Sequence, residues 1–121
     1  MPRTWRHKFR DAFLGIWLAI RSERSFLVHL PAAVLVSIFS ALLHVSLVEA
    51  GLLGLCVTIV LTAEMFNTAL ERLARAIDGK ENAHLAAALN IASGAVLTAS
   101  IGAALVGLVI FASRLMISFN A

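Results

Sequence analysis

Two glutamates and one asparagine lie inside an apolar stretch and are the residues best suited to chemistry. Glu64, Asn67 and Glu71 follow the spacing i, i+3 and i+7, so on a helix all three project from one face over two turns. No charged residue occurs between Gly51 and Glu64. An ionised group inside a membrane-spanning helix costs roughly 2.5 to 3.5 kcal/mol on insertion scales and usually faces a polar interior. The three residues therefore predict a polar stripe that has a function.

The composition indicates an integral membrane protein. The chain has 121 residues, of which 60% are hydrophobic and 14% charged, and its mean hydropathy is +0.91, which lies outside the range of soluble domains. The net charge of +3 comes from basic residues at the ends of apolar runs, where cytoplasmic loops and anionic head groups account for them. We therefore expect no nucleic-acid partner. Cys56 stands alone, which excludes a disulfide framework and a thiolate metal site.

Apolar periodicity predicts an all-α membrane protein, in which residues 1–121 form a single domain. In the N-terminal part, apolar residues at spacings of four, four and three lie opposite basic residues, as in a helix that lies in the membrane interface. We expect this interfacial helix at about 4–24, followed by spans at about 26–47, 51–73 and 85–117 that pack as a helical bundle. Each of these spans is long enough to cross a hydrocarbon core of about 30 Å.

The distribution of Lys and Arg predicts the orientation. Nine basic residues lie on one side of the predicted spans and Arg114 alone lies on the other. The larger group is Arg3, Arg6, Lys8, Arg10, Arg21, Arg24, Arg72, Arg75 and Lys80. Because cytoplasmic flanks carry the excess of positive charge, the N-terminus is expected to be cytoplasmic.

The segment from Glu64 to Glu71, Glu-Met-Phe-Asn-Thr-Ala-Leu-Glu, resembles the signature of the prokaryotic diacylglycerol kinase family. These are small integral-membrane lipid kinases that include the undecaprenol kinases. Residues 22–30 and 90–96, which read Ser-Glu-Arg-Ser-Phe-Leu-Val-His-Leu and Asn-Ile-Ala-Ser-Gly-Ala-Val, resemble the entries to that family's first and third spanning helices. The resemblance covers nearly the whole chain without large gaps.

This resemblance implies an enzyme of the bacterial inner membrane. The expected reaction is ATP-dependent, Mg²⁺-dependent phosphorylation of a membrane alcohol such as diacylglycerol or undecaprenol, at the cytoplasmic face. The expected assembly is a homotrimer whose active sites are shared between subunits. Because the sequence has no phosphate-binding loop of the soluble kinases, the ATP site would have to be assembled between helices.

The resemblance also implies a role for each polar residue. Glu64 matches the general base that acts on the lipid hydroxyl, and Asn67 lies where it can orient the substrate or either acid. Glu23 and Glu71 match the two glutamates that hold the metal and nucleotide, which agrees with the preference of Mg²⁺ for one or two carboxylates plus phosphate and water. The structural alternative for the stripe is that its members only form hydrogen bonds across helices.

The nucleotide side departs from the family pattern. Arg75 stands where the family has an acid, and Leu89-Asn90 stands where it has Lys-Asp. We hypothesise that Arg72 and Arg75 supply the lost phosphate-binding charge, because a guanidinium binds phosphate oxygens bidentately. Asn90 keeps the shape and one acceptor of the aspartate and is counted with the nucleotide-binding residues.

A second function follows from the same departures. The chain would then be a catalytically silent family member that binds lipid or serves as a membrane partner subunit. Retention of Glu64, Asn67 and Glu71 favours the enzyme over this alternative. His29 could also bind a ligand, although a histidine at the interface end of a span is more often a hydrogen-bonded packing residue.

Overall fold

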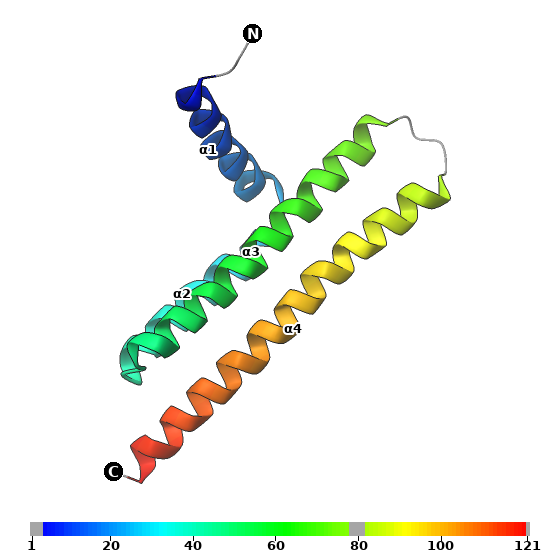
Figure 1. The fold of residues 1–121 in the computed structure, drawn as a ribbon. Coiled ribbons are helices and arrows are strands. Elements are labelled where there is room, and N and C mark those ends of the chain that lie inside the picture. Colours follow the sequence, from blue (N-terminus) through cyan, green and yellow to red (C-terminus); the bar gives the residue numbers. More distant parts are fainter. Residues whose placement is uncertain (1–3, 78–81, 121) are drawn as a thin grey trace.

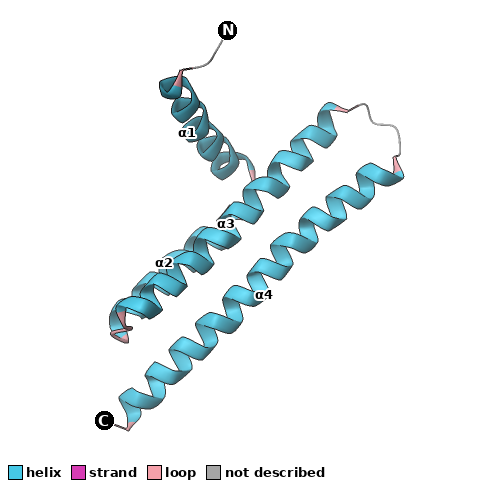
Figure 2. Cartoon of the chain, in the orientation of Figure 1, coloured by secondary structure: helices cyan, strands magenta, loops and turns pink. Residues whose placement is uncertain are grey.

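A computed structural model describes residues 4–77 and 82–120, and all regular structure within them is α-helical (Figures 1 and 2). The helices, in chain order, are α1 (Trp5–Ser22), α2 (Phe26–Leu42), α3 (Leu47–Ala76) and α4 (Ala83–Phe119). The predicted all-α class is confirmed. Arg3 and Lys80, two of the residues used to predict the orientation, lie outside the described residues.

Helix α3 is the centre of the arrangement. It contacts the other three helices, and its contact with α4 is the most extensive in the described chain. Figure 1 shows α2 and α4 running beside α3 in the opposite direction, with α1 pointing away from this group of three. Small residues of α4 lie at these contacts, because Ala103 and Gly107 line a cavity between α2, α3 and α4, and small side chains let helix backbones approach one another closely.

Helix α1 meets α2 at a bend of 104°. The bend lies between Ser22, where α1 ends, and Phe26, where α2 begins. A helix turned this sharply from its neighbour can lie along a membrane surface while the neighbour crosses the membrane. The interfacial position predicted for this helix remains a prediction.

The first spanning helix is shorter than the span of about 26–47 that its apolar run predicted. Helix α2 ends at Leu42 rather than near residue 47, because the chain turns through His44, whose φ of 51° lies in the left-handed region. Ser46 then caps α3: its hydroxyl accepts from the N–H of Glu49, and the Glu49 carboxylate accepts from the N–H of Ser46. This capping box assigns residues 43–46 to a turn and a helix start.

Two helices can each cross a membrane by length and composition. These are α3, with 30 residues, and α4, with 37; at 1.5 Å per residue they exceed a core of about 30 Å. The pair α1 and α2 passes the same test only when taken together, so the described chain has two or three candidate spans. Exposed large apolar side chains cover these helices, as expected where they face lipid or neighbouring helices.

An ion pair joins α3 and α4 at the end of the molecule where the chain terminates. Arg114 donates to Glu49 through Nε at 2.8 Å, and its Nη2 also contacts the same oxygen. Glu49 is thus held both by its own helix start and by the partner helix. The contact joins the first turn of α3 to the C-terminal part of α4.

Candidate active site

Glu64 is buried in the described chain and meets a histidine from another helix. The Glu64 side chain is 3% exposed, and its Oε2 lies 3.4 Å from Nε2 of His29, whose side chain is 22% exposed. His29 is in the first turns of α2, close to the junction with α1. A buried carboxylate is stable only with a partner, and the imidazole is that partner. Sequence reasoning interpreted His29 as a packing residue and did not connect it with Glu64.

Thr68 is a second residue that sequence reasoning missed. It is buried beside Glu64, and its Oγ1 donates to the Glu64 carbonyl at 2.9 Å. Because this bond lies within the helix, the hydroxyl is satisfied without using the Glu64 carboxylate. The signal in the sequence was its position four residues after Glu64, on the same helix face.

Asn67 and Glu71 form the other half of the stripe. Nδ2 of Asn67 donates to Oε1 of Glu71 at 3.1 Å, whereas the buried Oδ1 of Asn67 has no hydrogen-bond partner in the described structure. Asn67 is 9% exposed and lines a groove of about 710 Å³ between α3 and α4. An unpaired buried acceptor costs roughly 1 to 3 kcal/mol, so a ligand that supplies a donor or a cation would be stabilised there.

The predicted stripe therefore has two different neighbours. Glu64 meets α2 through His29, while Asn67 pairs with Glu71 and faces the groove toward α4. All three residues lie within one arc of α3, as their spacing requires. The sequence alone did not show that one part of this face contacts α2 and another part faces α4.

The described structure does not pair the other predicted site residues with Glu71. Glu23 is partly buried directly after α1, whereas Arg72, Arg75 and Asn90 are exposed on α3 and α4. Across residues 4–77 and 82–120, no hydrogen bond or ion pair joins any of these four to Glu71. The nucleotide-side set is thus not assembled within one copy of the described chain.

The residues present fit a magnesium ion held partly by substrate. No group of three or more His, Cys, Asp or Glu side chains in the described parts of the chain could hold a metal ion. Mg²⁺, however, is commonly bound by one or two carboxylates and completes its shell with water and phosphate oxygens. The Glu71 carboxylate and the unpaired Oδ1 of Asn67 are hard oxygen atoms of the required kind.

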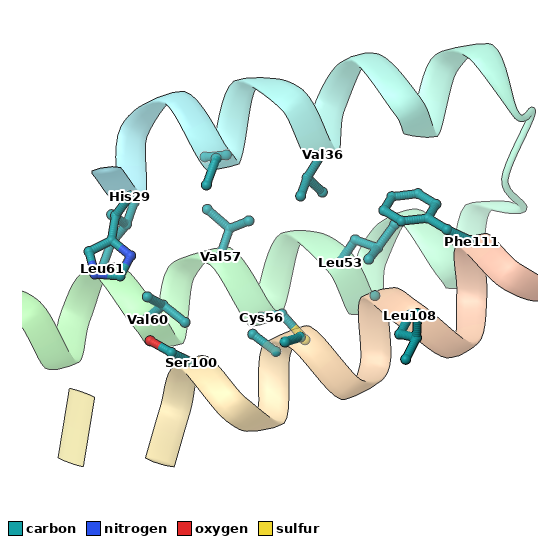
Figure 3. Close-up of a pocket in the computed structure, with 15 residues that line it drawn as sticks. His29, Val36, Leu53, Cys56, Val57, Val60, Leu61, Ser100, Leu108 and Phe111 are labelled. Carbon is teal, nitrogen blue, oxygen red and sulfur yellow. The ribbon is translucent and has the colours of Figure 1, made fainter. Parts of the chain in front are cut away.

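An apolar cavity of about 460 Å³ lies between α2, α3 and α4 (Figure 3). His29 lies at one end and Phe111 at the other, with aliphatic side chains such as Val36 and Val57 between them. Ser100 is the polar residue that α4 contributes to the lining. A hydrocarbon chain fits such a lining, and it would place a polar head near His29 and Glu64.

The described chain is a small helical membrane protein with a buried carboxylate–imidazole pair at the end of an apolar cavity. Its residues 10–111 match the family model of prokaryotic diacylglycerol kinase. The chain belongs to the prokaryotic diacylglycerol kinase family, as its motifs predicted. As a member of that family it is a lipid kinase, which is a phosphotransferase.

Two characterised proteins are similar over most of the chain. The undecaprenol kinase of Bacillus subtilis is 34% identical over 107 residues, which are 88% of this chain and 87% of that protein. The diacylglycerol kinase of Synechocystis is 36% identical over 100 residues, which are 82% of this chain but only 57% of that protein. No solved structure matches the chain.

Proposed function

We propose that this protein transfers the γ-phosphoryl group of ATP to the hydroxyl of a membrane lipid alcohol, either undecaprenol or diacylglycerol. The observation that carries the proposal is the buried Glu64–His29 pair at the end of an apolar cavity. The similar proteins named undecaprenol kinase and diacylglycerol kinase support both lipid classes as substrates.

The lipid side of the reaction would use residues of one chain. The hydrocarbon part of the substrate would occupy the apolar cavity, and its hydroxyl would lie near His29, in the first turns of α2. Glu64 would activate that hydroxyl, which is the role its position in the family motif implies. Since α2 begins beside the bend to α1, a lipid with its hydroxyl at the membrane interface would not need to leave the bilayer.

The nucleotide side would use the polar residues toward the end of α3. Glu71 and Glu23 would hold Mg²⁺, which neutralises phosphate charge when bound, and Asn67 would orient Glu71 through the hydrogen bond already present. Arg72, Arg75 and Asn90 would bind phosphate oxygens. Because these three side chains are exposed and form no hydrogen bond or ion pair with Glu71 in the described structure, we propose that a homotrimer completes the site with residues from neighbouring copies.

The orientation that we propose places the N-terminus and the active site in the cytoplasm, in a bacterial inner membrane. In Figure 1, α1 and the last turns of α3 lie toward one end of the molecule, and the last turns of α4 lie toward the other. The described basic residues other than Arg114 belong to the first group of segments or to the turn after α1, whereas Arg114 belongs to α4. This distribution supports the orientation expected from the positive-inside rule. ATP is also a cytoplasmic phosphate donor.

The alternative of a catalytically silent family member is not favoured. Both similar proteins are named as kinases, and Glu64, Asn67 and Glu71 are all retained. The residues that we propose for the lipid half moreover lie together in one chain, with Glu64 beside His29 and the cavity next to His29.

The direct test is phosphoryl transfer by the purified protein in mixed lipid bicelles with labelled ATP and Mg²⁺. We expect labelled lipid phosphate from undecaprenol, diacylglycerol or both, and a loss of roughly 10² to 10⁴-fold in kcat for Glu64→Gln. Thr68→Val is a matched control, because it changes a buried neighbour of Glu64 without removing a titratable group. Absence of transfer to both lipids by well-folded wild-type protein would refute the proposal.

A further inference from the structure

The apolar cavity between α2, α3 and α4 is long and narrow. Its lining on α4 runs from Ser100 to Phe111, which is roughly 16 Å at 1.5 Å per residue, and its volume is about 460 Å³. An apolar cavity of about 150 Å³ holds one benzene molecule. The volume therefore equals about three benzene-sized spaces in a row, which is wide enough for one hydrocarbon chain but not for two chains side by side.

The two ends of the cavity differ in chemistry. Figure 3 shows His29 and Ser100 toward one end and Phe111 at the other. Glu64 lies 3.4 Å from His29 at the polar end. At the far end the rings of Phe111 and Phe39 lie 6.1 Å apart and join α4 to α2. A lipid in this cavity would therefore hold its polar end at His29 and extend its hydrocarbon toward the phenylalanine pair.

Small side chains line the cavity on two of its helices. Helix α2 contributes Ala32 and Ala33, and α4 contributes Ala103, Ala104 and Gly107. A chain with methyl branches at regular intervals would fill the space that these residues leave, whereas an unbranched acyl chain would leave part of it empty. Because protein interiors are close-packed and leave few voids, the lining favours a branched chain.

We infer that the lipid substrate is a single-chain isoprenoid alcohol, which the cavity selects by its width and by its closed end at Phe111. This inference rests on the proposed function and chooses between the two lipid classes named there. An isoprenoid alcohol carries its hydroxyl at the end of one chain, so the chain fills the cavity while the hydroxyl lies at the His29 end, next to the Glu64 carboxylate. In diacylglycerol, the carbon atom beside the hydroxyl-bearing carbon already carries an ester-linked chain. This branch point would fall where His29 of α2 meets the buried Glu64 of α3.

The volume also predicts how much of the chain is recognised. On the benzene scale the cavity holds roughly 15 to 20 carbon atoms, which correspond to three or four isoprene units. Further units would remain in the bilayer, whose hydrocarbon is as apolar as the side chains of the lining. The protein should therefore distinguish the first few units from the hydroxyl and be indifferent to the rest.

The first test is phosphorylation in mixed micelles with ATP and Mg²⁺, with every lipid at the same mole fraction. Geraniol, farnesol, geranylgeraniol and undecaprenol supply two, three, four and eleven isoprene units. We expect kcat/KM to rise up to geranylgeraniol and to change by less than about twofold from there to undecaprenol. Diacylglycerol should be at least about tenfold poorer than undecaprenol, because its branch point overfills a space for one chain.

The second test changes the length of the cavity. A Cβ atom at Gly107, one turn before Phe111, would lie 4.0 Å from Cδ2 of Leu53, so the fold should accept Gly107→Val. This variant should lower kcat/KM for geranylgeraniol and undecaprenol roughly threefold to tenfold, with geraniol unaffected. Gly102→Val is the matched control, because Gly102 is outside the lining and a Cβ there has no neighbour within 4 Å in the described structure. Phe111→Ala opens the far end, so kcat/KM should continue to rise from geranylgeraniol to undecaprenol.

Three results would overturn the inference and leave the proposed function standing. These are equal kcat/KM values for diacylglycerol and undecaprenol, a steady rise of kcat/KM with chain length in the wild-type protein, and wild-type chain-length profiles for both Gly107→Val and Phe111→Ala. The unfolding temperature of each variant shows whether it is folded, and Phe111→Ala decides the outcome if Gly107→Val is not. Absence of transfer to every lipid by folded wild-type protein would instead refute the proposed function, and the inference with it.

Discussion

The Glu64–His29 contact predicts an asymmetric response of stability to mutation. In His29→Leu, the Glu64 carboxylate stays buried, with a side chain 3% exposed, and loses its partner. Leaving a buried polar group without its partner costs roughly 1 to 3 kcal/mol of unfolding free energy, and more where that group is charged. We expect His29→Leu to fall in that range.

The reverse substitution should cost much less. Glu64→Leu leaves an imidazole whose side chain is 22% exposed, so we expect a loss of about 1 kcal/mol. Replacing both residues with leucine removes the buried polar pair altogether, and the double variant should unfold within about 1 kcal/mol of wild type, since apolar replacement of a buried pair is often neutral. The double-mutant cycle should therefore give a coupling of roughly 1 to 3 kcal/mol.

Reversible unfolding in mixed micelles, followed by circular dichroism across a denaturing-detergent titration, measures these differences. His84→Leu is the matched control: His84 is an exposed histidine at the start of α4, and its replacement should change stability by less than about 0.5 kcal/mol. A loss below about 1 kcal/mol for His29→Leu would show that His29 does not stabilise the buried Glu64 side chain.

Three further outcomes are expected. Arg75→Ala and Arg72→Ala should each raise the KM for ATP roughly threefold to tenfold, as for one lost hydrogen bond at an exposed site, with an unchanged KM for lipid; equal changes in both constants would contradict a phosphate-binding role. Arg114→Met should lower the unfolding temperature because it leaves Glu49 without its partner on α4. The control Arg6→Met, at an exposed position of α1, should leave the unfolding temperature unchanged. Equal unfolding temperatures for the two variants would show that the ion pair does not stabilise the bundle. A reporter fused to the C-terminus should read as periplasmic, and a cytoplasmic signal would reverse the proposed orientation.

Local patterns in the sequence were sufficient for much of the fold. The long apolar runs predicted α3 and α4, because a run of that length in a membrane protein forms a helix that satisfies its own backbone. The end of α2 was not predictable from hydropathy, since Val45 and Leu47 continue the apolar run through the turn. The left-handed conformation of His44 follows the end of that helix, and the capping box at Ser46 starts the next one. Hydropathy averaged over a window of residues does not detect either of these local geometries.

The candidate site was predictable along one helix but not between helices. The spacing of Glu64, Asn67 and Glu71 placed them on one face of α3, which is a property of the helix itself. The partner of each residue depends on how α2 and α4 pack against that face, and periodicity has no information about packing. His29 thus looked like an ordinary interfacial histidine, and only its distance to Glu64 connects it with the site.

The two halves of the site differ in how far a single chain completes them. The proposed lipid half is held by contacts within the chain, because Glu64, His29 and the cavity come from helices that pack on one another. The proposed nucleotide half includes the exposed side chains of Arg72, Arg75 and Asn90, and Leu89, next to Asn90 on α4, is half-buried. A lysine at position 89 could extend its charged end to the surface from such a position, so Leu89→Lys with Asn90→Asp should be tolerated by the fold. If Arg72 and Arg75 have taken over phosphate binding, this double change should raise activity most where one of these arginines has been removed.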